Sequence, residues 1–443
     1  MKQLKYLIFA FILLNLNGLN LIWINLNAKF EIEPTRLYAD DLSELKISGY
    51  GTISTSFDDR QFIKPARDIG QSSSRGIYRT DWTTLMDSRL GLQAHYRANQ
   101  DLDFVVQGVL RDQAYVTFKN SLESAYFAFR PDSWIELRGG RIGYDAFLMS
   151  DTRNLGYAYS WVRPPIEFYG WIPIFHIDGA DTTFRLNGED SQWRLRLQAG
   201  EQGLIFPINS VDFDSSTTGL HAITISRQSG NIVLKAGYSK FSFKNEFELF
   251  SNLHSGEGYR GLEQIMADST LPPEIIEEAR YLHDNVTFKG VNVTYITFGA
   301  SYDDGDWILQ AEIAQSTSTA EVFSHGKMGY AALGYRIRDF TPYFIYSAIR
   351  AGNDVRQPLA DWSALEESWL QSQSIGIINT TRMDQETLSL GVRWDFHLQA
   401  ALKFQLDNTH YHSNGHGLVF CSEDTLLNDN RMTLGTISME VMF

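Results

Sequence analysis

Eight residues near the middle of the chain indicate most plainly which fold the sequence encodes. They read Gln192-Trp193-Arg194-Leu195-Arg196-Leu197-Gln198-Ala199. Polar and apolar residues alternate without a break. Because successive side chains of a β-strand point to opposite faces, this alternation predicts a strand with one polar and one apolar face. The same pattern recurs at residues 89–97, 387–394 and 399–406.

Segments of this kind are about ten residues long, the length that a tilted strand needs to cross a bilayer. We count about sixteen of them, an even number that suits a closed membrane barrel. They are residues 46–57, 87–98, 101–113, 121–131, 134–142, 177–188, 191–201, 218–228, 231–243, 291–302, 305–316, 326–337, 340–350, 385–396, 398–410 and 431–443.

The links between these strands alternate between short and long. Turn-forming residues occupy the short links, such as Asn99-Gln100, Ser229-Gly230 and Asp303-Asp304-Gly305. Long links are expected at residues 58–86, 143–176, 202–217, 244–290, 351–384 and 411–430. All short turns then lie at one end of the strands, as in a transmembrane antiparallel β-barrel with short periplasmic turns and long outer loops.

Four tryptophans support this interpretation. Trp134, Trp193 and Trp307 each follow a short turn, and Trp394 precedes one. Aromatic rings at one depth form the interfacial girdle of a membrane barrel. The alternative is a soluble β-sandwich whose tryptophans fill a core, but a sandwich rarely has so many strands joined by such unequal loops.

Composition and charge exclude other classes of protein. With 38 Lys or Arg against 53 Asp or Glu, the formal net charge is −15, whereas a nucleic-acid partner requires a basic surface. Beyond the N-terminus no apolar run is long enough for a membrane-spanning helix. The single cysteine, Cys421, can form neither an internal disulfide nor a cysteine-based zinc site.

The first residues have the pattern of a secretory signal peptide. Lys2 and Lys5 precede an apolar run over residues 6–14, which asparagines then interrupt. We expect a signal peptide at 1–28, a periplasmic segment at 29–45 and the transmembrane barrel at 46–443. Secretion with almost no cysteine suits a bacterial envelope.

The last strand and the fifth strand resemble those of Gram-negative outer-membrane porins. The chain ends in alternating residues that close on Phe443, which resembles an outer-membrane sorting signal. The opening segment 47–52 carries two glycines, as first strands of porins do. Leu137-Arg138-Gly139-Gly140-Arg141 resembles the segment that leads into their third loop. The stretch at 150–165 resembles a set of largely uncharacterised proteobacterial porin-like proteins.

The resemblance implies that the third loop, residues 143–176, folds into the pore. It also implies a bacterial outer-membrane location, with outer-membrane lipid and small hydrophilic solutes as partners, and it admits a homotrimer. No cofactor and no nucleic acid is expected. Water in the lumen would solvate the polar strand positions. Inward arginines are expected at Arg89, Arg97, Arg111, Arg138, Arg185, Arg194 and Arg196, and loop carboxylates at Asp145, Asp151, Glu167 and Asp178.

A basic wall that faces an acidic loop would place a transverse field across a narrow opening and select ions. Two long loops carry helix signals, at residues 274–280 and 361–367. These helices could cover the pore or contact a neighbouring subunit, and ordinary loop packing is the simpler interpretation.

Signals for an enzyme are weak. The sequence lacks the Gly-x-Ser-x-Gly, His-Glu-x-x-His and phosphate-loop motifs. His410 and His412 share a strand face, with His416 close by, and two such histidines can bind a metal. We nevertheless expect no metal site, because strand ends near headgroups often carry histidine.

The prediction is therefore a porin for passive diffusion rather than an enzyme. The alternatives are a barrel enzyme, such as a lipase or protease, and a substrate-selective channel. A selective channel would be expected to expose an aromatic ladder in the lumen, for which the candidates are Tyr157, Tyr159, Trp161 and Tyr169.

Overall fold

A computed structural model describes residues 44–59, 63–71, 82–113, 116–171, 174–208, 211–323, 326–412, 417–421 and 430–443. The expected signal peptide at 1–28 lies outside these residues, as does nearly all of the expected periplasmic segment at 29–45. The first strand begins at Glu44, two residues before the expected start of the barrel.

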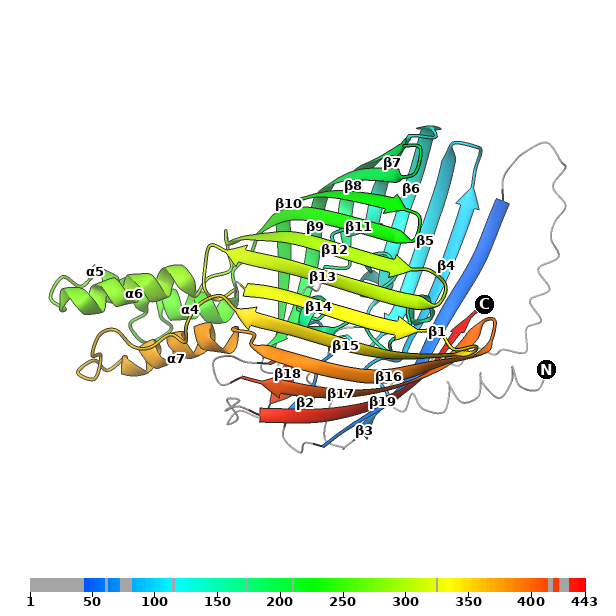
Figure 1. The fold of residues 1–443 in the computed structure, drawn as a ribbon. Helices are drawn as coiled ribbons and strands as arrows, with labels where there is room; N and C mark the ends of the chain where they lie inside the picture. Colours follow the sequence, from blue (N-terminus) through cyan, green and yellow to red (C-terminus); the bar gives the residue numbers. More distant parts are fainter. Residues whose placement is uncertain are drawn as a thin grey trace, which may run out of the picture.

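Within the described residues, one sheet of 17 strands closes into a barrel (Figure 1). All neighbours in the ring pair antiparallel. The two-residue strand β3 (Trp82–Thr83) adds only to one edge of β1, so sixteen strands form the wall. They are β1 (Glu44–Asp58), β4 (Arg89–Arg97), β5 (Leu102–Arg111), β6 (Leu122–Asp132), β7 (Ile135–Gly143), β8 (His176–Asn187), β9 (Gln192–Ile208), β10 (Val211–Ser229), β11 (Ile232–Phe243), β12 (Asn292–Asp303), β13 (Trp307–Ser318), β14 (Gly326–Tyr335), β15 (Phe340–Ala351), β16 (Gln385–His397), β17 (Ala400–Tyr411) and β19 (Asn430–Met442).

The barrel closes where the first strand meets the last. β1 pairs with β19 from Tyr50↔Met442 to Asp58↔Leu434, and with β4 along its other edge. The backbone of Phe443 exchanges two hydrogen bonds with Gly49, of 2.7 and 2.9 Å. A β-carbon on Gly49 would lie 2.5 Å from the Phe443 ring, so a larger residue there would require this ring to shift.

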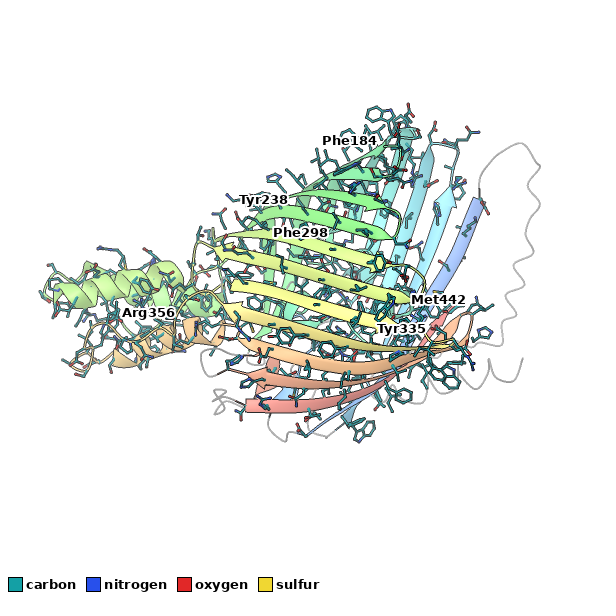
Figure 2. The ribbon with its side chains drawn as sticks, in the orientation of Figure 1. Phe184, Tyr238, Phe298, Tyr335, Arg356 and Met442 are labelled. Carbon is teal, nitrogen blue, oxygen red and sulfur yellow. The ribbon has the colours of Figure 1, made fainter. Side chains whose placement is uncertain are left out.

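The exterior of the barrel carries the apolar half of the alternation. Large apolar side chains at every second strand position are exposed, among them Leu92, Phe104, Ile296, Phe298 and Leu390. Trp134, Trp193, Trp307 and Trp394 are all exposed beside short turns, as expected. Phe184 and Tyr335, whose rings contact Trp134 and Trp307, lie at the same end of the barrel in Figure 2. A closed antiparallel barrel with such an exterior spans an outer membrane.

All sixteen predicted strands are present, but one predicted loop is wrong. Residues 202–217 are not a loop, because β9 continues to Ile208 and β10 begins at Val211. The two extensions pair with each other up to Val211↔Ile208, past an irregularity between Thr217 and Leu220. Polar and turn-forming residues in this stretch interrupt the alternation of polar and apolar residues that identifies a strand. Mutual pairing satisfies backbone groups that a loop would leave to water.

Helices in the long outer loops form an extension beyond the barrel (Figure 1). They are α4 (Glu248–Ser255), α5 (Leu262–Ala267), α6 (Pro273–Asn285) and α7 (Ser368–Thr380). The helix predicted at 274–280 is confirmed as part of α6, but the one at 361–367 is wrong. There Trp362 is buried and Asp361 accepts a hydrogen bond from Ser363 N, so a turn precedes α7. Of the described helices, none has the length and apolarity to span a bilayer.

Candidate functional site

The loop between β7 and β8, residues 144–175, folds into the barrel, as the resemblance implied. It contains a short 3₁₀ turn, η2 (Gly156–Ala158), and a single helical turn, α3 (Ile166–Tyr169). Its hydrogen bonds reach strands as far apart in sequence as β4, β11, β13, β15, β17 and β19. The loop is therefore fastened around most of the wall instead of hanging from its two ends.

The segment at residues 156–167, which we call the polar segment, is held by buried charges. Nε of Arg163 donates to Asp87 at 3.0 Å, and its Nη1 donates to Asp407 at 2.6 Å. Although burial acts to lower it, the charges of both carboxylates raise the pKa of Arg163 above its usual value. Arg163 thus joins the loop to two distant parts of the barrel, the approach to β4 and the middle of β17.

Further polar contacts fasten the same segment. The carboxylate of Glu167 accepts from Ser347 at 2.5 Å, from Gln385 at 2.6 Å and from Thr387. Lys403 Nζ of β17 donates to the carbonyl of Gly156 at 2.6 Å. These groups are buried, so each hydrogen bond replaces one with water and fixes the position of the loop.

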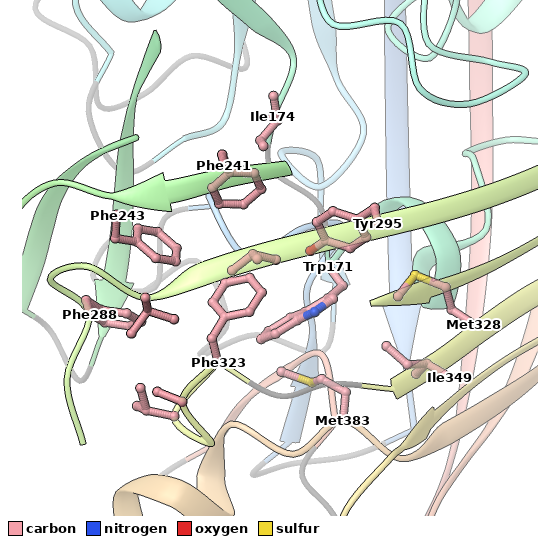
Figure 3. Close-up of a cluster of buried hydrophobic side chains, with 14 of the residues drawn as sticks. Trp171, Ile174, Phe241, Phe243, Phe288, Tyr295, Phe323, Met328, Ile349 and Met383 are labelled. Atoms are coloured by element: carbon pink, nitrogen blue, oxygen red, sulfur yellow. The ribbon is translucent and has the colours of Figure 1, made fainter. Parts of the chain in front are cut away.

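The remainder of the loop contacts the wall largely through a different surface, which we call the apolar patch: Phe147, Met149, Phe168, Tyr169 and Trp171. These side chains belong to one cluster with inward residues of β11–β15, several of which are labelled in Figure 3. The patch includes one polar contact, because Tyr169 Oη donates to the buried carboxylate of Glu312 on β13. The rings of Phe168 and Tyr330 lie 5.4 Å apart, and those of Trp171 and Phe323 lie 5.5 Å apart.

This apolar cluster corrects the expectation of a wholly wet lumen. The inward positions of β11–β15 include Phe241, Tyr295, Met328 and Ile345, all buried. Lumen-facing residues of a membrane barrel are usually polar because water contacts them. These residues can be apolar because the loop covers them. Dispersion contacts with the loop replace contact with water on this side of the barrel.

A buried carboxylate lies where the loop begins. Asp145 accepts from Arg196 Nη1 at 2.8 Å and pairs with Lys235. Burial alone would raise the pKa of Asp145, but the charges of Lys235 and Arg196 lower it below the usual range. The predicted pair of an inward arginine and a loop carboxylate therefore exists here, but as a closed ion pair.

Most of the other predicted arginines also have partners. Arg89 donates to Tyr159 Oη at 2.9 Å, and Arg111 donates to Asn154 at 2.7 Å, so both fasten the loop. The ion-pair partners along the wall are Asp181 for Arg138, Glu136 for Arg185 and Asp103 for Arg97. Arg194 is exposed beside the short turn before β9.

The predicted loop carboxylates divide in the same way. Asp145 and Glu167 are buried in contacts with the wall, whereas Asp151 is exposed. Asp178 lies in β8, not in the loop, and pairs with Arg141 at 2.7 Å. Of the predicted charges, only Arg194 and Asp151 are left exposed without an ion pair among the described residues.

One sector of the wall stays partly open to solvent. The inward side chains Gln93, His95, Gln107 and Tyr126, on β4–β6, are half-buried. These side chains share the inner faces of their strands with Arg89 and Arg111. Those two arginines contact the loop, whereas the half-buried side chains lie further from the end of the barrel that carries the long loops.

Sequence reasoning missed several residues that hold the loop. Arg163 precedes Pro164-Pro165 in the stretch that resembles porin-like proteins, but the sequence around a charged loop residue does not indicate whether it is buried. Lys235 and Lys403 occupy inward strand positions, and their strand parity could have found them. The candidate aromatic ladder is not exposed: Tyr159, Trp161 and Tyr169 are buried, and only Tyr157 is partly accessible.

Comparisons with known proteins agree with this architecture. No protein-family model matches the chain, and no curated protein matches its sequence. Among solved structures, OmpF of Salmonella typhi, in complex with daunomycin, superposes with a TM-score of 0.51 at 11% identity, over 90% of this chain and 97% of that one. Outer-membrane expressed OmpT of Vibrio cholerae superposes with a TM-score of 0.50 at 13% identity, over 92% and 99%.

The class that these observations define is the outer-membrane β-barrel. Within that class the chain has a porin-like fold, a closed ring of sixteen antiparallel strands with the third loop folded inside.

Proposed function

We propose that the chain is a porin whose water-filled channel lets small hydrophilic solutes and ions diffuse across the outer membrane. The observation that carries the proposal is the third loop, which is fastened inside the barrel while polar side chains on the inner face of β4–β6 stay half-buried and Asp151 of the loop stays exposed. A structured loop inside a wide barrel narrows the passage and thereby sets the size of the solutes that can diffuse through it.

The primary test is the single-channel conductance of the purified protein in planar bilayers. Removing residues 151–160 should raise the conductance, because these residues occupy the lumen. A matched control removes residues 257–268 from the helical extension and should leave the conductance unchanged. Equal conductance of the folded loop variant and the unaltered protein would place the loop outside the conducting path.

The charges that we propose for the channel are the predicted basic wall and loop carboxylates. Arg194 and Asp151 would act directly on permeating ions because they are exposed. Arg89, Arg111, Arg138, Arg185 and Arg196, with Asp145 and Glu167, would instead shape the passage through their fixed pairs. Ion pairing offsets the charges of Arg138, Arg185, Arg196 and Asp145. The groups that donate to Glu167 are neutral. Salt screens the fields of all these charges beyond about 8 Å at physiological ionic strength.

A substrate-selective channel is the second candidate within the same fold. It would show saturable solute flux, whereas a diffusion porin shows flux proportional to the solute gradient. Burial of Tyr159, Trp161 and Tyr169 favours the diffusion porin, since buried rings offer no stacking surface. Liposome swelling with sugars of increasing size distinguishes the two.

A barrel enzyme is the third candidate. A lipase or protease would hydrolyse its substrate without forming a pore, so assays of ester and peptide hydrolysis on the folded protein test it. Hydrolysis together with absent conductance would overturn the porin proposal. The resemblance to porins also admits a homotrimer, which cross-linking of the protein in membranes would test.

Phe443 is proposed as the sorting signal of the barrel. Its ring is 61% exposed and its backbone closes the ring of strands on Gly49. Deleting Phe443 should impair assembly, while Phe443→Tyr, which keeps an aromatic ring, should assemble. Normal amounts of heat-modifiable barrel after the deletion would contradict this role.

A further inference from the structure

Three potential metal ligands converge on the outside of the barrel, at the end with the long loops. Glu386 of β16 lies directly opposite His410 of β17 in the register of the sheet, and His412 follows just after β17 ends. Glu386 shares its strand face with the exposed Leu388 and Leu390. The cluster therefore lies on the exterior, above the lipid-facing surface and separate from the lumen.

The distances within this cluster are short. Nδ1 of His410 lies 3.7 Å from one carboxylate oxygen of Glu386, and Nε2 of His412 lies 4.0 Å from the other. The two imidazole rings are 4.2 Å apart between centroids. One ligand atom from each residue can be chosen so that all three lie within 4.8 Å of one another.

Neighbouring groups orient the cluster. Tyr346 Oη donates to Glu386 Oε2 at 2.9 Å, and Arg350 donates to the same oxygen. The backbone N–H of His412 donates to the carbonyl of Asp384 at 3.0 Å. Metal-binding carboxylates and histidines in proteins are typically held by such outer contacts.

One imidazole nitrogen of the cluster lacks a hydrogen-bond partner among the described residues. Nε2 of His412 is buried, and within the described residues it has no hydrogen-bond partner. A buried polar atom without a partner is costly, and such an atom calls for an unseen ligand or ion.

We propose that Glu386, His410 and His412 bind one divalent transition-metal ion of the zinc class. Two imidazoles and one carboxylate suit Zn²⁺, Cu²⁺ or Ni²⁺, whereas Ca²⁺ and Mg²⁺ prefer oxygen ligands alone. Tetrahedral bonds of about 2.0–2.1 Å require ligand atoms roughly 3.3 Å apart. With one ligand atom from each residue, all three atoms lie within 4.8 Å of one another. Side-chain rotation therefore has to close at most about 1.5 Å to reach that geometry.

The position of Arg350 sets a limit on affinity. Its guanidinium pairs with Glu386 and also lies 3.4 Å from Asp384. A cation beside the site disfavours a second cation, so binding should strengthen when this charge is removed. Three protein ligands would leave a fourth position on the ion for water.

Sequence spacing alone could not reveal this site. The histidines at positions 410 and 412 provide two ligands, which is too few for a specific site. The third ligand comes from the neighbouring strand, 24 residues away from His410 along the chain, and only the register of β16 against β17 brings it there.

The test is Zn²⁺ binding to the folded full chain in detergent, measured by calorimetry. One ion per chain is expected, with affinity weakened roughly tenfold or more in His410→Gln/His412→Gln and in Glu386→Gln. A matched control, His221→Gln/His397→Gln, removes two histidines that lie outside the cluster and should leave binding unchanged. Heat-modifiability on gels verifies that each variant is folded.

Cu²⁺ provides a second measurement that does not depend on affinity. Its electron paramagnetic resonance spectrum should show splitting from two imidazole nitrogens in the unaltered protein and lose it in His410→Gln/His412→Gln. Zn²⁺ affinity that is equal in the cluster variants and the control, or a copper spectrum without nitrogen splitting, would overturn the proposal. Neither measurement depends on channel activity, so the porin proposal is tested independently.

Discussion

The third loop meets the barrel through two unlike surfaces. The polar segment, residues 156–167, is held by a few buried charges, of which Arg163 between Asp87 and Asp407 is the centre. The apolar patch, by contrast, packs ring against ring on β11–β15. Charges need defined partners at defined distances, so they select one loop position. Apolar contacts are non-directional, so they add stability to whichever position the charges select.

This division also explains why the barrel interior tolerates so much charge. A buried ion pair gains little net energy, but removing one partner leaves an uncompensated charge. The polar segment should therefore be intolerant of substitution and the apolar patch tolerant.

The largest expected effect is that of Arg163→Met. It leaves Asp87 and Asp407 buried without a cation and should cost about 3–5 kcal/mol in the free energy of unfolding. Thermal or guanidinium unfolding of the detergent-folded protein measures this, and larger conductance fluctuations should accompany it. The matched control is Arg336→Met, because the Arg336–Asp303 pair is largely exposed and contributes about 0–1 kcal/mol.

Acidification should loosen the start of the loop, where Asp145 is paired with Arg196 and Lys235. The pKa of Asp145 is lowered below its usual value near 3.8, so its pairing stabilises the fold fully above that value. This stabilisation is lost as the pH falls further, through the folded-state pKa. The protection of amides at residues 144–150 against hydrogen exchange, relative to their intrinsic rates at each pH, should therefore fall below about pH 3.8. In Asp145→Asn the same residues should exchange faster at neutral pH and lose this acid dependence.

A conservative change in the apolar patch should have a modest effect. Phe168→Leu keeps most of the buried volume and should cost less than about 1.5 kcal/mol. Arg163→Lys is equally conservative in charge, yet it loses the planar fork that contacts Asp87 and Asp407, so it should cost more. If Phe168→Leu proves more destabilising than Arg163→Lys, the contrast between the two surfaces is wrong.

The smallest effect on stability is expected for the exposed charges, which should instead change ion preference. Asp151→Asn should shift the reversal potential towards anions and Arg194→Gln towards cations, both more at low salt than at high. Stability should change by no more than about 0.5 kcal/mol. Reversal potentials in a salt gradient test this, with Arg336→Gln as a control away from the loop. Unchanged potentials would mean that neither residue lines the conducting path.

Local patterns in the sequence are enough to specify the strands, their number and the end at which the short turns lie. Period-two alternation is a local property, and in a membrane barrel lipid enforces it on the outer face of every strand. Strand parity also placed Arg89, Arg138 and Arg196 on the inner face correctly. Local patterns gave the wrong prediction in two places. At residues 202–217 a loop was predicted, but the two strands pair with each other. At residues 361–367 a helix was predicted, but a turn forms in which Trp362 is buried.

The partners of the inward residues depend on the tertiary structure. Arg163 finds Asp407 across 244 positions of sequence, and Glu386 finds His410 through the register of two strands. It also turned one sector of the lumen from polar to apolar, because the loop covers Phe241 and Tyr295 there. Alternation specifies which face a side chain occupies, but its partner depends on where distant segments are brought together, and no local pattern encodes that.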